Sequence, residues 1–210
     1  TGEGQLEWRE GILKAYEELG RPTITAIAIT HSHQDHIGGL DRVFEMVKAP
    51  VRCHPKLVKR LGGIVGEENV VKLKAGERIR TGGGVSLRAI FTPGHEVDHV
   101  CYYLASDRVM FTGDTILGGS SSSVRDLGDY MKSLQKLARH RVEVICPAHG
   151  PVVPKPRGGR LIRWYINHRS EREQEVLASL RQGIGDVNEM VRDIYPRNLK
   201  KGLRRTAAGN

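Results

Sequence analysis

Four side chains of the kind that bind metal ions occur within six residues, directly after an apolar segment. The segment, residues 23–30, is β-branched and almost wholly apolar, which predicts a buried strand. The side chains that follow it are His31, His33, Asp35 and His36. Because side chains alternate along an extended backbone, His31 and His33 should point the same way. Imidazoles and carboxylates packed this densely are costly unless something binds them, so the loop predicts a site for two metal ions.

Three later segments repeat this layout. Each is a short β-type run that ends in a glycine-containing loop with one ligand-type side chain. The side chains are His95 in residues 91–95, Asp114 in residues 111–114 and His149 in residues 146–150. If these strands are neighbours, their ends meet at one edge of a sheet, where the first cluster also lies.

The seven side chains divide into two incomplete ligand sets. We predict one zinc ion on His31, His33 and His95, the other on Asp35, His36 and His149, with Asp114 as the bridge. We also assign catalytic roles to Asp35 and Asp114. Each zinc keeps a position open for a shared water, whose pKa the metals lower to about 7. The predicted chemistry is hydrolysis, in which a metal-bridging hydroxide attacks an electrophilic carbonyl or phosphorus.

The remaining four histidines are weaker candidates. His99 is a candidate to hold a metal ligand in place from behind. His168 lies on a predicted basic helix and competes with His149 for the second metal. We expect His54 and His140 at the surface, and Cys146, inside a strand-like run, to be a buried structural thiol.

Strands and helices are mixed along the chain. The sequence predicts strands at 51–53, 70–73, 85–91, 100–104, 109–111 and 142–146, and helices at 6–19, 40–48, 126–138, 160–182 and 186–195. Asp126 is the expected N-cap of the third helix. This pattern predicts an α/β layered fold, in which the sheet is buried beneath helices.

Composition limits the possible partners. With 210 residues, 39% of them apolar and 27% charged, the chain is long enough for one globular domain and a small appendage. Lys and Arg number 33 against 24 Asp and Glu, and the net charge of +9 favours anionic partners. No segment approaches the roughly 18 apolar residues that a membrane helix needs, so we expect no membrane partner. The three scattered cysteines form no CxxC pair, which argues against a secreted disulfide scaffold and favours a reducing compartment.

The motifs resemble those of the metallo-beta-lactamase-fold superfamily. They are T-H-S-H-Q-D-H-I-G-G at 30–39, T-P-G-H at 92–95, F-T-G-D at 111–114 and P-A-H-G-P at 147–151, in the family's order. The resemblance covers most of the chain. It implies an αββα sandwich with a dinuclear zinc site at one edge.

Within that superfamily, the chain looks most like the beta-lactamase-like protein 2 group. The resembling stretches are residues 113–118, 126–134 and 165–173. The group includes a mitochondrial endoribonuclease that acts on single-stranded RNA, so the resemblance implies that activity. It also implies an intracellular location, in the mitochondrial matrix or the cytoplasm.

The same resemblance suggests how the chain is divided. We expect a metallo-beta-lactamase-like domain at residues 1–182 and the start of a winged-helix-like segment at residues 183–210. The chain begins at Thr1-Gly2, which resembles a turn that follows the first strands of the family. We therefore expect those N-terminal strands to be missing.

RNA hydrolysis is the leading functional hypothesis. The stretch 151–170 contains five basic residues and no acidic one, and residues 195–210 contain five more basic residues and no acid. Basic stretches follow phosphate backbones, and Trp164 and Tyr165 are candidates to stack on bases. A solvated basic helix face with aromatic residues in the core is the structural alternative.

Other activities stay open. Residues 92–103 also look like glyoxalase II, and the main alternative is a thioester hydrolase of the glyoxalase II or acyl-carrier thioesterase type, acting on a small anionic thioester. However, residues 120–123 are serines where glyoxalase II has a Gly-Cys-Gly-containing stretch. An iron-dependent sulfur dioxygenase and a non-catalytic binding protein are weaker possibilities, and β-lactam hydrolysis has no specific support.

Overall fold

A three-stranded parallel sheet forms the first half of the chain. The computed structural model describes residues 1–195. In it, the first sheet has the order β1 (Ile27–Ala28), β2 (Val51–Cys53) and β3 (Val70–Lys72). The helices of this half are α1 (Leu6–Glu18), α2 (Gln34–Ile37), α3 (Leu40–Val47) and α4 (Val58–Val65). Ile27, Val51 and Leu61 belong to one buried cluster, which lies between this sheet and α3 and α4.

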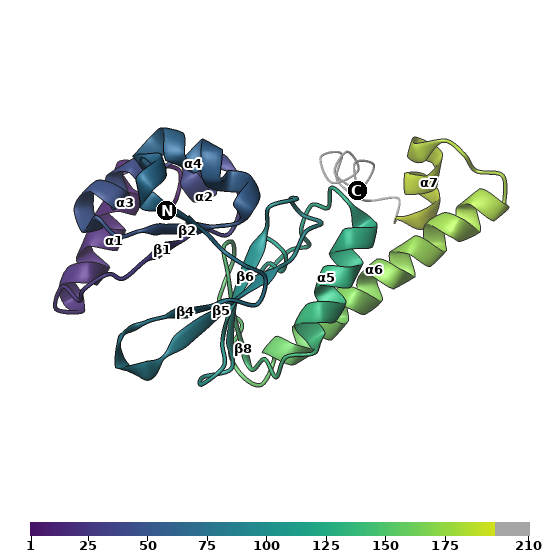
Figure 1. Cartoon of the computed structure of the whole chain (residues 1–210). Coiled ribbons are helices and arrows are strands. Elements are labelled where there is room, and N and C mark those ends of the chain that lie inside the picture. The colour runs from purple at the N-terminus through teal and green to yellow at the C-terminus, as the bar shows by residue number, and fades with distance from the viewer. Residues whose placement is uncertain (196–210) are drawn as a thin grey trace.

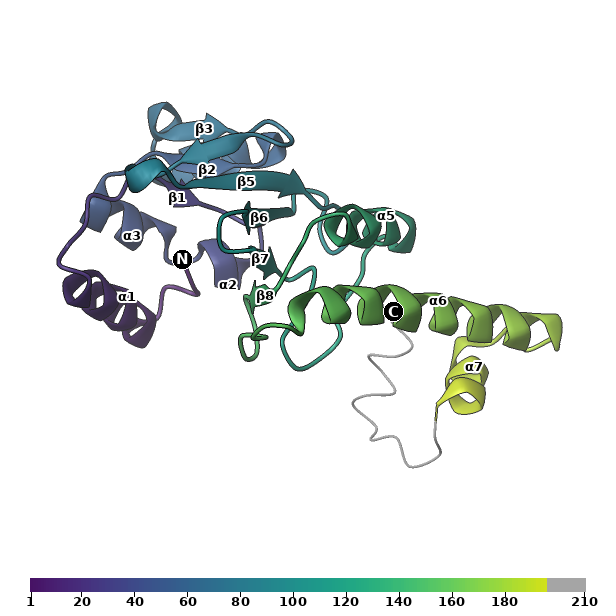
Figure 2. The same ribbon diagram turned by 90° about the horizontal axis from the view of Figure 1, so that it is seen from below.

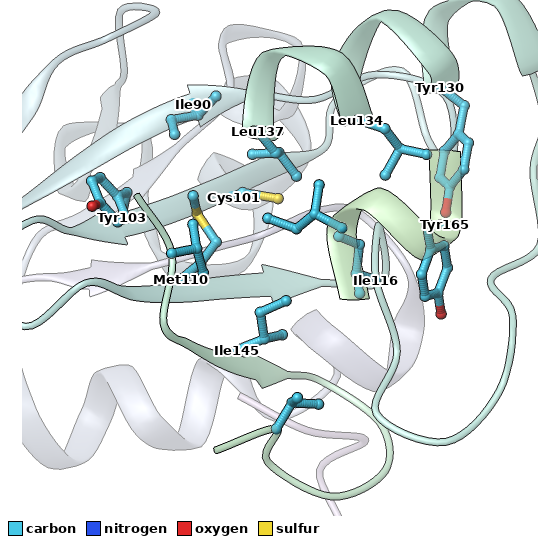
Figure 3. Packing of buried hydrophobic residues seen from close by; sticks show 13 residues of the cluster. Ile90, Cys101, Tyr103, Met110, Ile116, Tyr130, Leu134, Leu137, Ile145 and Tyr165 are labelled. Atoms are coloured by element: carbon cyan, nitrogen blue, oxygen red, sulfur yellow. The ribbon is translucent and has the colours of Figure 1, made fainter. Parts of the chain in front are cut away.

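A five-stranded mixed sheet forms the second half. Its order is β4 (Arg78–Arg80), β5 (Ser86–Phe91), β6 (Val100–Leu104), β7 (Val109–Gly113) and β8 (Val144–Pro147). Helices α5 (Leu127–Ala138) and α6 (Gly158–Arg181) cover its outer face (Figure 1). Figure 3 shows Met110 and Ile145 of this sheet packed with Leu134 and Leu137 of α5.

The two sheets face each other, which gives four layers in the order α/β/β/α (Figure 2). The sequence of strand β6 is apolar throughout because both of its faces are covered. Cys101 and Tyr103 point to the cluster beneath α5 and α6, whereas Val100 and Tyr102 lie in the cluster between the sheets. The Tyr102 hydroxyl donates a hydrogen bond to the Ile29 carbonyl at 2.6 Å and so connects the two sheets.

Strand direction brings the loops with ligand-type side chains to one edge. Strand β6 runs antiparallel to both β5 and β7, and β8 runs parallel to β7. Strands β5, β7 and β8 therefore point the same way, and their carboxyl ends share one edge of the sheet. The loops after these three strands carry His95, Asp114 and His149.

Several predicted elements differ from the observed ones. The strand predicted at 23–30 is assigned only at Ile27–Ala28, although Ile29 still donates a backbone hydrogen bond to Arg52. Helix α4 and strand β4 are not predicted by the sequence pattern, because both are short and lie close to glycines at 62–63 and 82–84. The N-cap prediction is confirmed, because the Asp126 carboxylate accepts the Asp129 N–H at 2.8 Å.

Helix α6 extends well beyond the sheets, and α7 (Val187–Ile194) lies against its far end (Figure 2). The Ser179 hydroxyl donates to Asp193 at 2.7 Å, and the Arg172 guanidinium lies 4.3 Å from the Tyr195 ring centroid. The remainder of the predicted winged-helix-like segment, residues 196–210, lies outside the described residues. Within residues 1–195, no helix combines the length and apolar character needed to cross a bilayer.

Candidate metal centre

The turn after β1 directs four side chains to one place. His31 is completely buried, and the chain then enters α2 with His33 as the residue before the first helical turn. Asp35 and His36 lie within that short helix, so they project beside the two preceding histidines. The tight sequence spacing therefore becomes a spatial cluster.

All seven predicted ligand side chains come together in the structure. They form two groups, within each of which the ligand-type atoms lie within 4.8 Å of one another. One group contains His31, His33, His95 and Asp114, and the other contains Asp35, His36, Asp114 and His149. These are the two predicted sets, with Asp114 common to both.

The two oxygens of Asp114 face different groups. Oδ2 lies 3.5 Å from His95 Nε2 and 3.9 Å from His31 Nε2. Oδ1 lies 3.4 Å from His36 Nε2 and 3.5 Å from His149 Nε2. A single carboxylate therefore reaches both groups, one oxygen to each.

The other contacts within the groups are equally short. His33 presents Nδ1, at 2.9 Å from His31 Nε2 and 3.2 Å from His95 Nε2. In the second group, Asp35 Oδ2 lies 3.0 Å from His149 Nε2 and 3.4 Å from His36 Nε2. Among the described residues, both groups therefore offer only nitrogen and oxygen atoms as ligands, and neither contains a thiol.

The buried atoms of this cluster fit a pair of metal ions. His36 Nε2 and Asp114 Oδ1 are buried without a hydrogen-bond partner, which is costly unless another ligand satisfies them. Burial, with the neighbouring imidazoles of His99 and His36, holds the pKa of His31 far below its ordinary value. Its ring is therefore neutral, which is the form that binds metal.

Burial raises the pKa of Asp114, but the imidazoles of His36, His31 and His149 outweigh this effect. The net result is a pKa below the ordinary value of an aspartate. Asp114 is therefore ionised, with both oxygens available as acceptors.

The outer nitrogens of the histidines are also held. The Thr30 hydroxyl lies 3.2 Å from Nδ1 of both His31 and His36. His95 Nδ1 lies 2.9 Å from the Ser123 carbonyl, to which it can only donate. The Ser123 carbonyl thus leaves Nε2 of His95 as the lone pair that faces the cluster, and the Thr30 oxygen can accept Nδ1–H from His31 and His36, which fits the same tautomer in both rings.

Glu96 holds the one ring that is turned the other way. Its Oε1 lies 3.3 Å from His33 Nε2, and its Oε2 accepts a hydrogen bond from Arg125 at 3.0 Å. Desolvation raises the pKa of Glu96, but Arg125 and the other neighbours lower it to a net value below the ordinary one. This explains why His33 presents Nδ1 to His31 and His95. Glu96 is not among the residues predicted from sequence, although its position next to His95 is a usable signal.

His99 lies behind Asp114, as expected. The Asp114 backbone N–H donates to His99 Nε2 at 3.1 Å, so the ring proton is on Nδ1 and points to the Thr92 hydroxyl at 2.8 Å. Burial, with nearby histidine rings, lowers the pKa of His99 well below its ordinary value. Gly113, at φ +50°, leaves room for the ring, because a Cβ there would lie 2.6 Å from Nε2.

The other candidates lie elsewhere. His168 belongs to neither group and stacks on Trp164 instead. His54 and His140 are partly exposed, and each packs one face against an aromatic ring, of Phe91 and Tyr103 respectively. Cys146 was predicted to be buried, but it is only half-buried in the structure.

Two side chains of the stretch predicted to contact nucleic acid, Tyr165 and Arg169, are buried. The Tyr165 hydroxyl lies 2.5 Å from the Ser120 carbonyl, and only 1% of the residue is exposed. The Arg169 guanidinium donates to the Ser122 carbonyl and lies 5.5 Å from the Tyr130 ring centroid. Both side chains support the 117–123 loop and the helices beneath it.

A pocket of about 430 Å³ opens beside the second group. Asp35, His36 and His149 line one side of it, and residues 1–3, Gln5 and Trp8 line the other. His149 is half-exposed and Asp35 is partly exposed here. This side of the cluster is therefore open to a molecule from solvent.

Comparison with known proteins places the fold and the motifs in one family. The model of the metallo-beta-lactamase superfamily matches residues 1–149, which include all seven side chains. A metallo-beta-lactamase family protein of Thermus thermophilus superposes with a TM-score of 0.68 and 23% identity, over 98% of this chain and 79% of that one. The predicted sandwich fold is thereby confirmed.

Curated relatives agree. The beta-lactamase-like protein 2 homolog of Caenorhabditis elegans is 34% identical over 182 residues, which are 87% of this chain and 60% of the relative. The lactamase-like protein adaB of Aspergillus niger is 33% identical over 86% of this chain and 53% of its own length. An atrochrysone carboxyl ACP thioesterase of Claviceps purpurea is 30% identical over 99% of this chain and 65% of its own length. The chain thus spans between half and two thirds of these relatives, and it belongs to the metallo-beta-lactamase superfamily.

Proposed function

We propose that the chain is a dinuclear zinc hydrolase. The observation that carries this proposal is the Asp114 carboxylate, whose two oxygens face two separate groups of three ligand-type side chains. The ligands would be His31, His33 and His95 at one ion, Asp35, His36 and His149 at the other, and Asp114 at both. Nitrogen and carboxylate donors in sets of this size suit zinc.

The residues themselves define how the site works. Zinc held by these side chains would supply Lewis acidity, which makes water nucleophilic near neutral pH and polarises the bond to be cleaved. Asp114 sets the separation of the two positions, since its oxygens are joined through one carbon. Asp35, on the open side, would hold an ion through Oδ2, and its other carboxylate oxygen can then accept a proton during turnover. Thr30, Glu96 and Ser123 fix the rings, so the site is organised before substrate arrives.

Single-stranded RNA is the proposed substrate, and endonucleolytic cleavage is the proposed reaction. The chain has a net charge of +9, and the stretch 151–170, which follows the His149 loop, contains no acidic residue. A positive surface beside the catalytic centre attracts a phosphate backbone and raises its local concentration.

Thioester hydrolysis is the second candidate. A relative named as an ACP thioesterase matches 99% of this chain, and its name points to an acyl group on a carrier protein. The same pair of zinc ions suits a thioester carbonyl. The two candidates differ in substrate rather than in the metal centre.

A side-by-side assay tests both proposals. The purified protein is analysed for zinc by elemental analysis and is assayed against single-stranded RNA and an acyl-glutathione thioester. Bound zinc near two ions per chain with cleavage of RNA supports the primary proposal. Cleavage of the thioester alone would transfer the proposal to the second candidate, and a protein without metal affinity would overturn both.

A further inference from the structure

A pocket of about 270 Å³ lies at the first turns of α6. Its lining combines two arginines and an exposed indole with small and apolar residues. The lining residues are Gly118, Val153, Arg157, Arg160, Leu161 and Trp164. None of them belongs to either ligand group.

The two arginines are free to take an anion. Both are exposed, and among residues 1–195 neither guanidinium has an ion pair or a side-chain hydrogen bond. By contrast, Arg52 and Arg108 of the same chain are paired with Glu77 and Glu143. Since no acidic residue occurs in 151–170, neighbouring sequence does not neutralise the pocket.

Trp164 presents an aromatic surface at the same place. It is 49% exposed, whereas its neighbour Tyr165 is buried. One face of the indole is backed by the His168 ring, at 4.8 Å between centroids and 27° between planes. The indole is thus held in a fixed orientation, which lowers the entropy lost when a flat group stacks on it.

The pocket adjoins the metal centre through backbone. Gly118, in its wall, donates its N–H to the His149 carbonyl at 3.0 Å. Gly118 also packs directly on Pro151, so a side chain could not be accommodated there. In Figure 2 the start of α6 lies beside β8, the strand that leads to His149. A chain-like substrate that passes over the metal centre would therefore reach this pocket.

We propose that the α6 pocket is a nucleotide subsite, in which Arg157 and Arg160 bind a phosphate and Trp164 stacks on the adjoining base. The inference rests on the proposed function, since it takes single-stranded RNA as the substrate. A fixed aromatic face combined with unpaired cations is the usual chemistry of single-strand recognition. An acidic carrier protein would use the charges but would leave the indole without a role.

Tryptophan fluorescence tests the subsite without requiring cleavage. The chain contains two tryptophans, so in Trp8→Phe the only indole signal comes from Trp164. Adenosine 5′-monophosphate, which has no internal phosphodiester bond, is titrated into this zinc-loaded variant. We expect saturable quenching, and we expect inorganic phosphate to compete with it. Absence of quenching at millimolar nucleotide would overturn the subsite.

Charge variants test the arginines. Arg157→Gln with Arg160→Gln should weaken binding of a single-stranded oligonucleotide and reduce its log–log salt dependence by about 0.7 for each lost phosphate contact. The matched control is Arg181→Gln, at the exposed far end of the same helix, which should leave both unchanged. Trp164→Ala should lower affinity about tenfold with the salt dependence retained. An unchanged affinity in both pocket variants would overturn the proposal.

Failure of the subsite and failure of the proposed function have different signatures. If RNA is cleaved and the pocket variants cleave it with normal KM, the subsite is wrong and the function stands. If nucleotide quenches Trp164 but RNA is not cleaved, the subsite stands as a nucleotide site and the ribonuclease function is wrong. Binding of an acidic acyl carrier protein that depends on Arg157 and Arg160, without nucleotide binding, would overturn the subsite in favour of a protein partner.

Discussion

At the scale of single residues, Asp114 determines how the two ligand groups are related. Its oxygens lie 3.4 to 3.9 Å from four different imidazole nitrogens, so any change in its position affects both groups. His99 holds its backbone, and Gly113 makes room for His99. The position of the Asp114 carboxylate thus depends on His99 and on Gly113.

Replacing Asp114 by Asn should remove the negative charge with little change in volume. We expect zinc content to fall to one ion per chain or fewer and turnover to fall at least about 100-fold, since both ions lose a ligand. Elemental analysis and steady-state kinetics measure these effects, and a thermal melt separates them from misfolding. A variant that keeps two ions and normal turnover would refute the bridging role.

His149 and His168 provide a matched pair of variants. His149→Ala should lower occupancy of one zinc position, because its Nε2 lies within 3.5 Å of Asp35 and Asp114. His168→Ala should leave zinc content unchanged, because it stacks on Trp164 outside both groups. Titration with a chromophoric chelator gives the number of ions bound. The reverse result would assign the ligand to α6.

The seven ligand candidates could be predicted from sequence because each lies at the end of a short apolar run, where local pattern determines position. Glu96 and Thr30 are not marked by such a run, although Glu96 adjoins His95 in sequence. Thr30 contacts the rings of its own loop, whereas Glu96 reaches His33 only when the loops after β1 and β5 come together. The burial of Arg169 was likewise unpredictable, because its partners, the Ser122 carbonyl and the Tyr130 ring, are distant in sequence.

At the scale of elements, strands were predicted best where buried apolar side chains mark them. Residues 100–104 match β6 at both ends, because the strand is apolar throughout and ends in a turn. Residues 51–53 match β2, in which Val51 and Cys53 are buried and Arg52 is partly exposed. The strand after residue 23 is shorter than predicted, because few of its residues pair with β2. Edge strand β4 contains two arginines around one buried isoleucine, which leaves little hydrophobic pattern to detect.

The contact between the His95 loop and α5 gives a prediction at this scale. Gly94 has φ +132°, and a Cβ there would overlap the Tyr130 backbone. Its carbonyl also accepts the N–H groups of Arg125 and Asp126. Gly94→Ala should therefore lower the free energy of unfolding by about 3 kcal/mol and impair metal binding by His95.

The control for Gly94 is Gly63→Ala. Gly63 is exposed in α4, and a Cβ added there would meet nothing within 4 Å. Since alanine favours helix over glycine by up to about 1 kcal/mol, this variant should be as stable as the parent or more stable. Urea denaturation of both variants measures the difference. If the two variants were equally stable, the close approach of Gly94 to the Tyr130 backbone would not require glycine at position 94.

At the scale of the whole molecule, the metal centre joins the two halves of the fold. Four ligand candidates follow the first strand of the first sheet, and three follow strands of the second. The division into residues 1–182 and 183–210 stays a prediction. The sequence shows which stretches are basic. It does not show which arginines lack an acidic partner, because that depends on tertiary contacts.

Removing the metals should make stability depend on pH in a defined direction. His31 and His99 are buried with lowered pKa values, so they are neutral in the folded state. In the unfolded chain each binds a proton below about pH 6.5. Stability of the metal-free protein should thus be constant above that pH and fall below it, by up to about 1.4 kcal/mol per pH unit for each histidine.

Urea unfolding of the chelator-treated protein at pH 7.5, 6.0 and 5.0 measures this dependence. His99→Gln should make the decline less steep, because one of the two histidines is removed. A metal-free protein with the same stability at all three pH values would contradict the assignment of neutral, buried rings.

The order of the ligands along the chain has a consequence for biosynthesis. A ribosome releases the segment with His31 to His36 first, His95 and Asp114 next, and His149 last. In a nascent chain the first proposed set is complete once Asp114 has been added, whereas the second set stays incomplete until His149. Because binding energy is realised only with a complete set, the ion held by the second set would be captured last, after both sheets have been synthesised.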